Sequence, residues 1–375
     1  MSSKSKANHF QRRQFIKSGL ALSGIAAASA LGAPRASAAA SKSLDPVNPD
    51  IHFGTTGSIF GSWPNDGITR VGPLQSTDMA MMLADCKHFG LEGFEPYSGQ
   101  VVQFIDKPLE LRKMADDAGV TICGIGDLAR RPGGRDTSSP ASAGVVAPRP
   151  WLGEEGNTKL IADMVSFARD FLAPLGIDHW KTNMGSRPPG GPSDDQLKRL
   201  ADTLNEIGRQ TSDFGVRLAP HPHIWGPLER EHDLRTVMSL TDPRYVWLTL
   251  DTGHNVLGGM DPVQIIDDYF PRLAEVHLKD TYVKYRGNTD TPTQAQHRES
   301  NLYGMLGSGG VDFPGIFKIL RTRHFKGWAI FDMDAPRPGD GTGSVDDNLR
   351  VDVNYMRDVL HVKLPKPPAT GLFKG

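Results

Sequence analysis

Histidine, lysine and aspartate side chains close several short apolar runs in the second half of the sequence. The runs at residues 216–223, 245–254, 273–280 and 326–334 end in HPH, DTGH, HLKD and DMD, respectively. Two or three of the imidazoles in these endings, with at least two of their carboxylates, would give the donor composition of a divalent metal site. A mixed nitrogen and oxygen donor set suits Mn, Co, Zn or Fe better than Mg or Ca, which prefer oxygen ligands. The sequence therefore predicts a metal centre built from the ends of these runs.

Eight apolar runs of strand length alternate with helical patterns along the chain. This alternation is typical of a parallel sheet, and 375 residues are enough for one (β/α)8 TIM barrel of the α/β class with loop insertions. An open doubly wound sheet is the alternative, but no G-x-G-x-x-G follows the first run. We expect strands at residues 51–57, 91–97, 120–126, 177–183, 216–223, 245–254, 273–280 and 326–334. We expect helices near residues 77–89, 108–118, 158–171, 193–214, 231–240, 262–269, 313–323 and 346–360.

The carboxyl ends of the strands form the active-site rim of such a barrel. The polar endings described above would all lie on that rim. Glu95 and Lys181, which close the second and fourth runs, would join them there. A long insertion at residues 127–151, rich in Arg, Pro, Gly and Ser, would form a surface loop or a lid.

Four motifs in the second half, in this order, are DTGH, VHLKD, LGSGGVDFPGIFKIL and GWAIFDMD. This series resembles the xylose isomerase-like sugar isomerase/epimerase superfamily, a group that includes ketose epimerases, inosose dehydratases and endonuclease IV. The resemblance covers roughly residues 51–360, and its strongest motifs lie in the second half. It implies the TIM barrel fold and a metal-dependent site.

The resemblance implies that Asp251 and His277 are metal ligands. The family usually supplies a glutamate from strand five and another from strand eight. This sequence departs at both places, with His221 on strand five and Asp332 on strand eight. Asp334 would lie on the same face as Asp332 and is the alternative ligand. We therefore predict His221, Asp251, His277 and Asp332 as the metal ligands.

The two missing glutamates also act as acid and base in ketose epimerases, so the proton shuttle must come from other residues. We expect Lys181 or Lys279 to neutralise developing enolate charge, although an ion pair with a buried acid is an equal alternative for Lys279. His254 would act on the substrate or cap a helix, and His223 would bind the metal or contact the substrate. Glu95 would be a substrate-facing or a structural carboxylate. The candidate catalytic residues are thus Glu95, Lys181, His223, His254 and Lys279.

These features predict a divalent-metal-dependent isomerase or epimerase that acts through an enediolate on a non-phosphorylated sugar or keto-sugar. A dehydratase or lyase acting by β-elimination on an inosose or a 3-keto-glycoside is the alternative, and the HPH strand is similar to inosose dehydratase-like members. A non-catalytic sugar-binding barrel is the second alternative, and an accessory subunit is a third. An endonuclease would need more ligands and a basic face, which the charge does not favour.

The first residues have the features of an export signal. Arg12 and Arg13 precede an apolar stretch at residues 19–31, and a small-residue cleavage site follows at residues 36–38. We therefore expect a twin-arginine signal peptide at residues 1–38, a linker at 39–50, a single barrel domain at 51–362 and a tail at 363–375. The mature chain would keep 36 basic and 43 acidic residues, a net charge of −7. We expect a periplasmic or secreted protein without a stable membrane anchor or a nucleic-acid partner, and the sequence leaves a homo-oligomer open.

Three smaller features also carry expectations. Cys86 and Cys123 are expected to be buried free thiols, with a single bridge as the alternative. The glycine-rich loop at residues 306–312 lacks the lysine of a phosphate-binding loop, so we expect a turn before the last barrel helix. Tryptophans are expected to line a sugar pocket or to pack in the core; they are Trp63, Trp151, Trp180 and Trp225.

Overall fold

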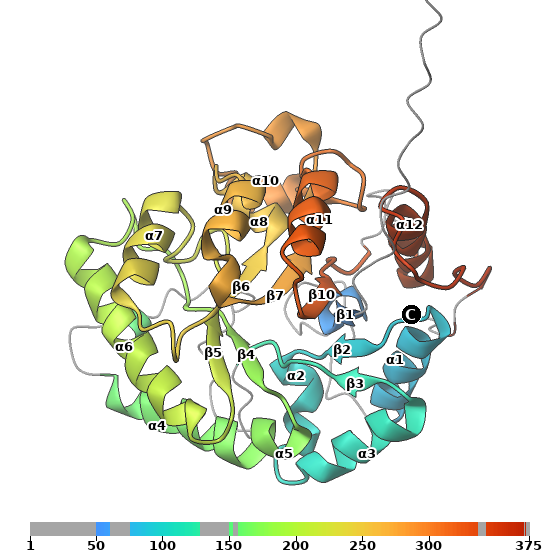
Figure 1. The fold of residues 1–375 in the computed structure, drawn as a ribbon, viewed down its shortest axis with the longest axis horizontal. Coiled ribbons are helices and arrows are strands. Elements are labelled where there is room, and N and C mark those ends of the chain that lie inside the picture. Colours follow the sequence, from blue (N-terminus) through green and yellow to red (C-terminus); the bar gives the residue numbers. More distant parts are fainter. Residues whose placement is uncertain are drawn as a thin grey trace, which may run out of the picture. The chain divides into compact units, whose positions relative to one another are not determined.

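Parallel strands alternate with helices along the chain in the computed structural model (Figure 1). The structure describes residues 50–60, 76–127, 150–152, 157–336, 343–370 and 372. The chain divides into two units, Met1–Leu44 and Asp45–Gly375, and all described residues belong to the second. The predicted signal peptide, Trp63 and most of the 127–151 insertion therefore lie outside the described residues.

Eight strands form the wall of the barrel among the described residues. They are β1 (Ile51–Thr56), β2 (Gly93–Glu95), β3 (Thr121–Ile122), β4 (His179–Thr182), β5 (Arg217–Pro220), β6 (Leu248–Asp251), β7 (Leu273–Leu278) and β10 (Gly327–Phe331). Two further strands, β8 (Asp280–Thr281) and β9 (Tyr303–Gly304), pair with each other in antiparallel fashion.

The wall strands follow a single circular order. Six of them pair as β3-β2-β1-β10-β7-β6, and β4 pairs with β5. A parallel bridge between Leu218 and Val246 joins β5 to the segment that leads into β6. Between β3 and β4 no ladder is present in the described part of the chain. There the side chain of Asp127 accepts the backbone N–H of Asn183 at 3.0 Å, so a side-chain bond spans the gap.

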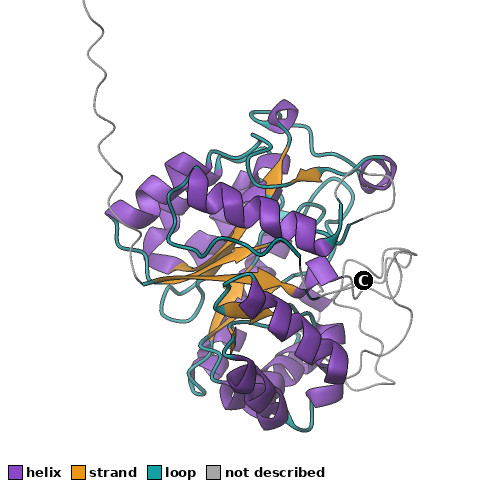
Figure 2. Cartoon of the chain, turned by 90° about the vertical axis from the view of Figure 1, so that its right-hand side faces the viewer, coloured by secondary structure: helices purple, strands orange, loops and turns teal. Residues whose placement is uncertain are grey.

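Helices surround these strands on the outside (Figure 2). The longer ones are α1 (Ser76–His88), α3 (Pro108–Ala118), α4 (Thr158–Phe167), α6 (Asp194–Ser212), α7 (Glu231–Leu240), α9 (Pro262–Tyr269), α11 (Phe313–Thr322) and α12 (Val345–Asp358). Short helices are α2 (Ser98–Val101), α5 (Ala173–Leu175), α8 (Thr252–Leu257) and α10 (Gln294–Glu299). None of the described helices is long and apolar enough to cross a membrane.

Local signals explain where several helices begin and end. Pro108 and Pro262 occupy the first helical position of α3 and α9, where a missing N–H costs nothing. Ser193 caps α6 by accepting the Gln196 N–H, as its sequence predicts. Gly215 follows α6 with a φ of 77°, a left-handed conformation that glycine adopts without strain.

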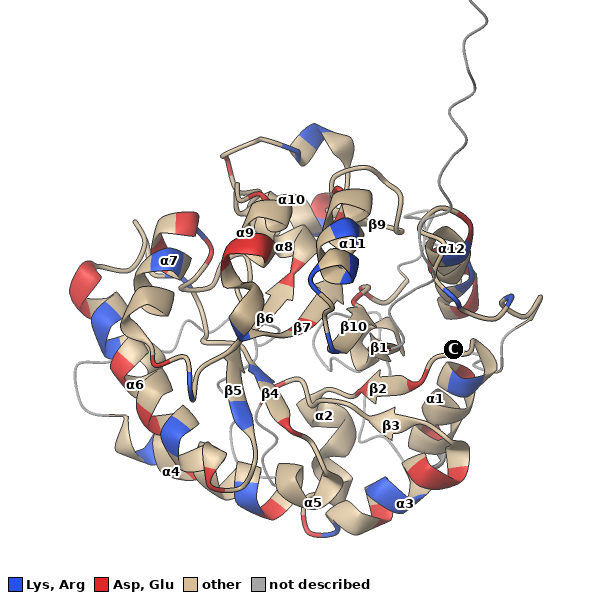
Figure 3. Cartoon of the chain, viewed as in Figure 1, with Lys and Arg blue, Asp and Glu red and all other residues tan. Residues whose placement is uncertain are grey.

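The apolar core lies between the strands and the helices. The Trp180 ring packs against Phe167 with centroids 5.3 Å apart, and the Phe53 ring stacks on Phe317. Charged residues on the helices are mostly of mixed sign, as Figure 3 shows for α3 and α6. Cys86 and Cys123 are free and buried, which confirms the expected thiols, and burial raises both pKa values.

One predicted strand is wrong at its carboxyl end. The sixth run was expected to remain extended through His254, but β6 ends at Asp251 and α8 begins at Thr252. The cause is local, because Asp251 Oδ1 accepts the His254 N–H at 2.7 Å and so caps a helix there. His254 consequently lies on the first turn of a helix above the strand.

Candidate active site and metal centre

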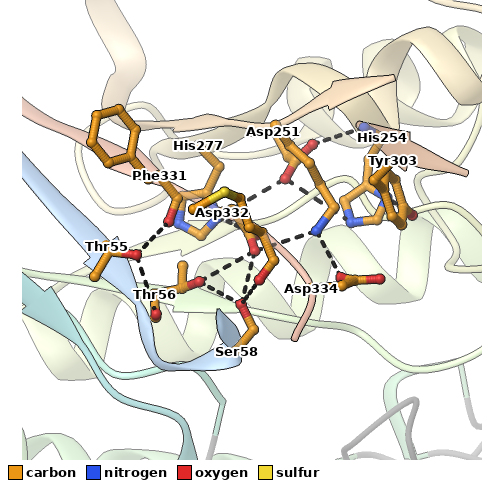
Figure 4. A network of polar contacts seen from close by, with 12 residues as sticks. Thr55, Thr56, Ser58, Asp251, His254, His277, Tyr303, Phe331, Asp332 and Asp334 are labelled. Carbon is orange, nitrogen blue, oxygen red and sulfur yellow. Dashed lines mark hydrogen bonds and ion pairs between the residues drawn. The ribbon is translucent and has the colours of Figure 1, made fainter. Parts of the chain in front are cut away.

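Four side chains converge at the carboxyl ends of neighbouring strands. His221 follows β5, Asp251 ends β6, His277 lies in β7 and Asp332 follows β10. Register explains the meeting, because Asp251 pairs with His277 across the β6–β7 ladder. One donor atom from each residue lies within 4.8 Å of the others, and all four residues are buried. Figure 4 shows Asp251, His277 and Asp332 pointing toward one another.

His221 and Asp251 leave two buried polar atoms facing each other. The Nδ1–H of His221 donates to Asn183 Oδ1 at 3.0 Å, so Nε2 keeps its lone pair. Among the described residues, neither His221 Nε2 nor Asp251 Oδ2 has a hydrogen-bond partner, and the two atoms lie 3.8 Å apart. That separation is too long for a hydrogen bond, but it suits two ligands of one cation at about 2.0–2.2 Å from each. The donor set present thus fits a divalent metal.

The two ring nitrogens of His277 each face a carboxylate. Its Nε2 lies 2.6 Å from Glu275 Oε1, and its Nδ1 lies 2.9 Å from Asp332 Oδ2. Burial alone lowers the His277 pKa, but Glu95 and the hydrogen bonds to Asp332 and Glu275 raise it well above its usual value. A divalent cation among these carboxylates would compete with the proton on Nδ1, as metal binding to imidazole generally does.

Asp332 and Asp334 occupy different environments. Asp332 accepts from Ser58 at 3.2 Å and from Lys279 at 3.3 Å, while its other oxygen faces His277. Asp334 instead contacts Lys279 at 3.1 Å and His297 at 3.4 Å. Of the two alternative ligands, the structure brings Asp332 to the four-residue cluster and leaves Asp334 on the wall of the adjoining cavity.

A cavity of about 150 Å³ adjoins the cluster. Four of the predicted catalytic residues line it, namely Lys181, His223, His254 and Lys279. Glu95 does not line it. The Glu95 carboxylate instead lies behind the cluster, 3.1 Å from Lys181 Nζ and 3.1 Å from His277 Nε2. This placement favours the structural of the two roles considered for Glu95.

Two imidazoles lie against each other at a tilt inside the cavity. The His223 and His254 ring centroids are 3.6 Å apart. His223 Nδ1–H donates to the Ile224 carbonyl, which leaves Nε2 as an acceptor. Burial lowers the His223 pKa to about 4, and burial with nearby cations lowers the His254 pKa well below its usual value. Both rings are therefore neutral at neutral pH and able to take a proton.

Several residues that line the cavity escaped the sequence analysis, among them Ser58, His297 and Tyr303. Tyr303 donates or accepts a hydrogen bond at 3.1 Å from His254 Nδ1, and its ring lies 4.3 Å from Lys279 Nζ. His297 packs on Tyr303 and on Trp225. Ser58 follows β1. His297 lies in α10 and Tyr303 in β9, within the insertion that follows β8, where no ending of a barrel strand marks them. Of the described tryptophans, Trp225 lines the cavity, whereas Trp151 and Trp180 pack in the core.

The glycine-rich loop at residues 306–312 binds a carboxylate of the chain itself. Asp280 accepts the backbone N–H groups of Gly307, Gly309 and Val311 at 2.9, 3.2 and 3.0 Å. The amides that could have held a phosphate are thus already occupied. The expected turn before α11 is confirmed.

Known proteins resemble this chain in sequence and in fold. A family model described as "Xylose isomerase-like TIM barrel" matches residues 83–358. An inosose dehydratase of Clostridium beijerinckii is 31% identical over 144 residues, which cover 38% of this chain and 48% of that protein. One from Clostridium botulinum is 29% identical over the same length and the same shares. The chain thus spans about half the length of the curated relatives it matches.

Solved structures share the fold at low sequence identity. A sugar phosphate isomerase/epimerase from Parabacteroides distasonis superposes with a TM-score of 0.56 at 17% identity, covering 84% of this chain and 96% of that one. The 3-keto-D-glucoside 4-epimerase of E. coli superposes with a TM-score of 0.54 at 16% identity, covering 79% and 97%. At such identities the likeness shows the α/β barrel fold alone.

Proposed function

The chain belongs to the xylose isomerase-like TIM barrel family, and from this premise we propose that it is a metal-dependent enzyme that removes a proton next to a carbonyl of a sugar or cyclic polyol. The observation that carries the proposal is the meeting of four ligand atoms within 4.8 Å beside two neutral imidazoles. When bound there, a divalent metal would act as a Lewis acid that polarises the substrate carbonyl.

His223 is the base in this proposal. Its Nδ1–H is held by the Ile224 carbonyl, so its Nε2 lone pair is available in the cavity. A positioned imidazole that takes a proton in the transition state contributes about 10²–10⁴-fold to the rate. Lys181 and Lys279 supply positive charge against the developing enolate. Both lysines line the same cavity as His223.

Loss of water is the outcome that the cavity supports best. In β-elimination the C–H bond breaks toward His223, a C=C bond forms, and the hydroxyl on the next carbon leaves as water after gaining a proton. His223 can return the proton it has taken to that leaving hydroxyl, because burial lowers its pKa to about 4 and its imidazolium gives the proton up readily. A curated relative at 31% identity is an inosose dehydratase, which agrees with this ranking.

Isomerisation or epimerisation, the first choice from the sequence, now ranks second. It begins with the same proton abstraction. Its return step needs a second group that both gives and takes the proton, and the two carboxylates beside Lys279 disfavour its neutral form.

A non-phosphorylated substrate agrees with the charges in the cavity. Lys181 pairs with Glu95, and Lys279 pairs with Asp332 and Asp334. Both lysines that line the described cavity are thus already paired with carboxylates and are not available to bind a phosphate group.

The test is incubation of the Mn²⁺-loaded protein with an inosose and with free keto-sugars in D₂O. We expect release of water and an unsaturated ketone from the inosose, and loss of this activity in His223→Gln with metal content unchanged. Deuterium incorporation without water loss would move the assignment to the epimerase branch. Activity confined to sugar phosphates would contradict the proposed substrate class.

We also propose that the enzyme acts outside the cytoplasm, because Arg12 and Arg13 precede the apolar stretch of the leader. Replacing both arginines with lysine should retain the protein in the cytoplasm. Amino-terminal sequencing of the exported wild-type protein should begin at Ala39. Export that is unaffected by the replacement would refute this proposal.

A further inference from the structure

A chain of ionisable side chains continues below the metal cluster through the barrel interior. His277 Nε2 lies 2.6 Å from Glu275 Oε1, and Glu275 Oε2 lies 2.7 Å from His179 Nε2. His179 Nδ1 in turn lies 2.8 Å from Asp178 Oδ1, and Asp178 forms an ion pair with Arg217. Bulky apolar side chains usually fill this part of a TIM barrel, so the polar chain needs an explanation.

We propose that Glu275, held in place by His179, is a positioning residue that fixes His277 in the tautomer with the proton on Nε2 and so presents Nδ1 to the metal. The proposal rests on the metal site of the proposed function. A carboxylate that accepts the second N–H of a metal-bound histidine orients the ring and raises its basicity as a ligand.

Alternating charges let a carboxylate remain ionised so deep in the protein. The Glu275 side chain is fully buried and that of His179 is 2% exposed, whereas Asp178 is 63% exposed at the far end of the chain. Burial lowers the His179 pKa, but hydrogen bonds to Asp178 and Glu275 outweigh it and raise the pKa to about 9. His179 is thus a cation between two anions, and a buried charge needs such partners.

Glu95 is a weaker candidate for the same role. Its Oε2 also approaches His277 Nε2, but at 3.1 Å, and its Oε1 lies 3.1 Å from Lys181 Nζ. Glu275 makes the shorter contact, and both of its oxygens contact imidazoles. The geometry therefore assigns the orientation of His277 to Glu275 first.

Cobalt binding tests the assignment without any substrate. The full-length protein is stripped of metal and titrated with Co²⁺, whose visible absorption reports the ligand geometry. We expect Glu275→Gln to bind Co²⁺ about 10–100-fold more weakly than the wild type, with altered bands. Asp178→Asn, at the exposed end of the chain, should have a smaller effect in the same direction.

Glu92→Gln is the matched control, because it removes a carboxylate from a histidine, His52, on the surface. Its Co²⁺ affinity and spectrum should equal those of the wild type. Wild-type affinity and spectrum in Glu275→Gln would overturn the positioning role and leave the metal site intact. Failure of the wild type itself to bind Co²⁺ would overturn both the metal site and the positioning role.

A measurement on the wild type keeps the proposal testable if Glu275→Gln does not fold. Long-range ¹⁵N–¹H correlation spectra of the Zn²⁺-loaded protein report the tautomer of each histidine. The signal of His277 should show a protonated Nε2 and a metal-bound Nδ1. A protonated Nδ1 on His277 would overturn the proposal.

Discussion

Single side chains in this site carry two roles at once, and Asp251 is the clearest case. Its Oδ1 accepts the His254 N–H at the start of α8, while its Oδ2 has no hydrogen-bond partner in the described part of the chain and faces His221. The capping role and the ligand role therefore use different oxygens of one carboxylate.

Asp251→Asn should separate these two roles. Asparagine caps helices about as well as aspartate, so the metal-free variant should unfold at a denaturant concentration close to that of the metal-free wild type. The loss of an anionic ligand should leave the purified variant without stoichiometric metal. The rate should fall by at least about 100-fold, because a Lewis acid stabilises the transition state by several kcal/mol. Elemental analysis and urea unfolding check both parts, and full metal content would contradict the assignment.

At the scale of elements, the sequence predicted most helices and the order of the strands because their signals are local. The bounds of α3, α7 and α9 agree with the expected ranges, since prolines and apolar spacing mark them. The strand ladders are shorter than the apolar runs, because inward-facing residues continue beyond the last paired residue. Glu275 escaped the sequence analysis. Strand alternation could have found it, because Glu275 lies two residues before His277 and therefore shares its inward face. Tyr303 and His297 could not be predicted, because tertiary packing alone brings them to the cavity.

Among the described residues, the side chain of Asp127 bridges the gap between β3 and β4. Its carboxylate accepts the Asn183 N–H at 3.0 Å and the Asn183 Nδ2–H at 3.1 Å, and Asn183 in turn orients His221. Asp127 has a φ of 67°, a left-handed conformation that glycine and asparagine tolerate better than most residues.

Asp127→Gly should therefore remove the bridge without adding backbone strain. We expect a loss of about 1–3 kcal/mol in the free energy of unfolding, together with weaker Co²⁺ binding because His221 loses its fixed partner. Asp127→Asn, which keeps one acceptor oxygen, should be intermediate in both measurements. Unchanged Co²⁺ affinity in the glycine variant would show that the bridge does not support the metal ligand.

The contact between α12 and the glycine-rich loop contains a buried acid, Asp352. Its Oδ1 accepts the Leu306 N–H at 2.8 Å, and no residue that the structure describes forms a hydrogen bond with its Oδ2. Burial, helped by the nearby Asp280, raises the Asp352 pKa to about 8 from a usual 3.8. Between pH 3.8 and about 8, Asp352 is protonated in the folded state and ionised in the unfolded state. The stability that this group contributes is therefore lost as the pH rises toward and through about 8.

Asp352→Asn should remove this pH dependence. At pH 9 the variant should be more stable than the wild type by about 1–3 kcal/mol, the cost of an unsatisfied buried polar group, and near pH 5 the two should differ little. Denaturant unfolding across this range gives the measurement, with the exposed Asp358→Asn on the same helix as the control. A parallel pH profile for the variant and the wild type would show that Asp352 is not the titrating group.

At the scale of the whole molecule, the proposed metal centre joins the ends of four strands, β5, β6, β7 and β10. A ligand that binds only the folded state stabilises it, by about 2.7 kcal/mol at a hundred times its Kd. We expect the Tm of the metal-free protein to rise by several degrees with Mn²⁺, Co²⁺ or Zn²⁺ and to return with a chelator. Asp251→Asn should show no such shift, and a wild-type Tm that ignores metal would contradict the site.

The most direct test of the central claim is an anomalous difference map from crystals soaked with Mn²⁺ or Zn²⁺. The account predicts one strong peak at ligand distance, about 2.0–2.3 Å, from His221 Nε2, Asp251 Oδ2, His277 Nδ1 and Asp332 Oδ2. No peak among these four atoms, or a peak bound by Asp334 in place of Asp332, would contradict it.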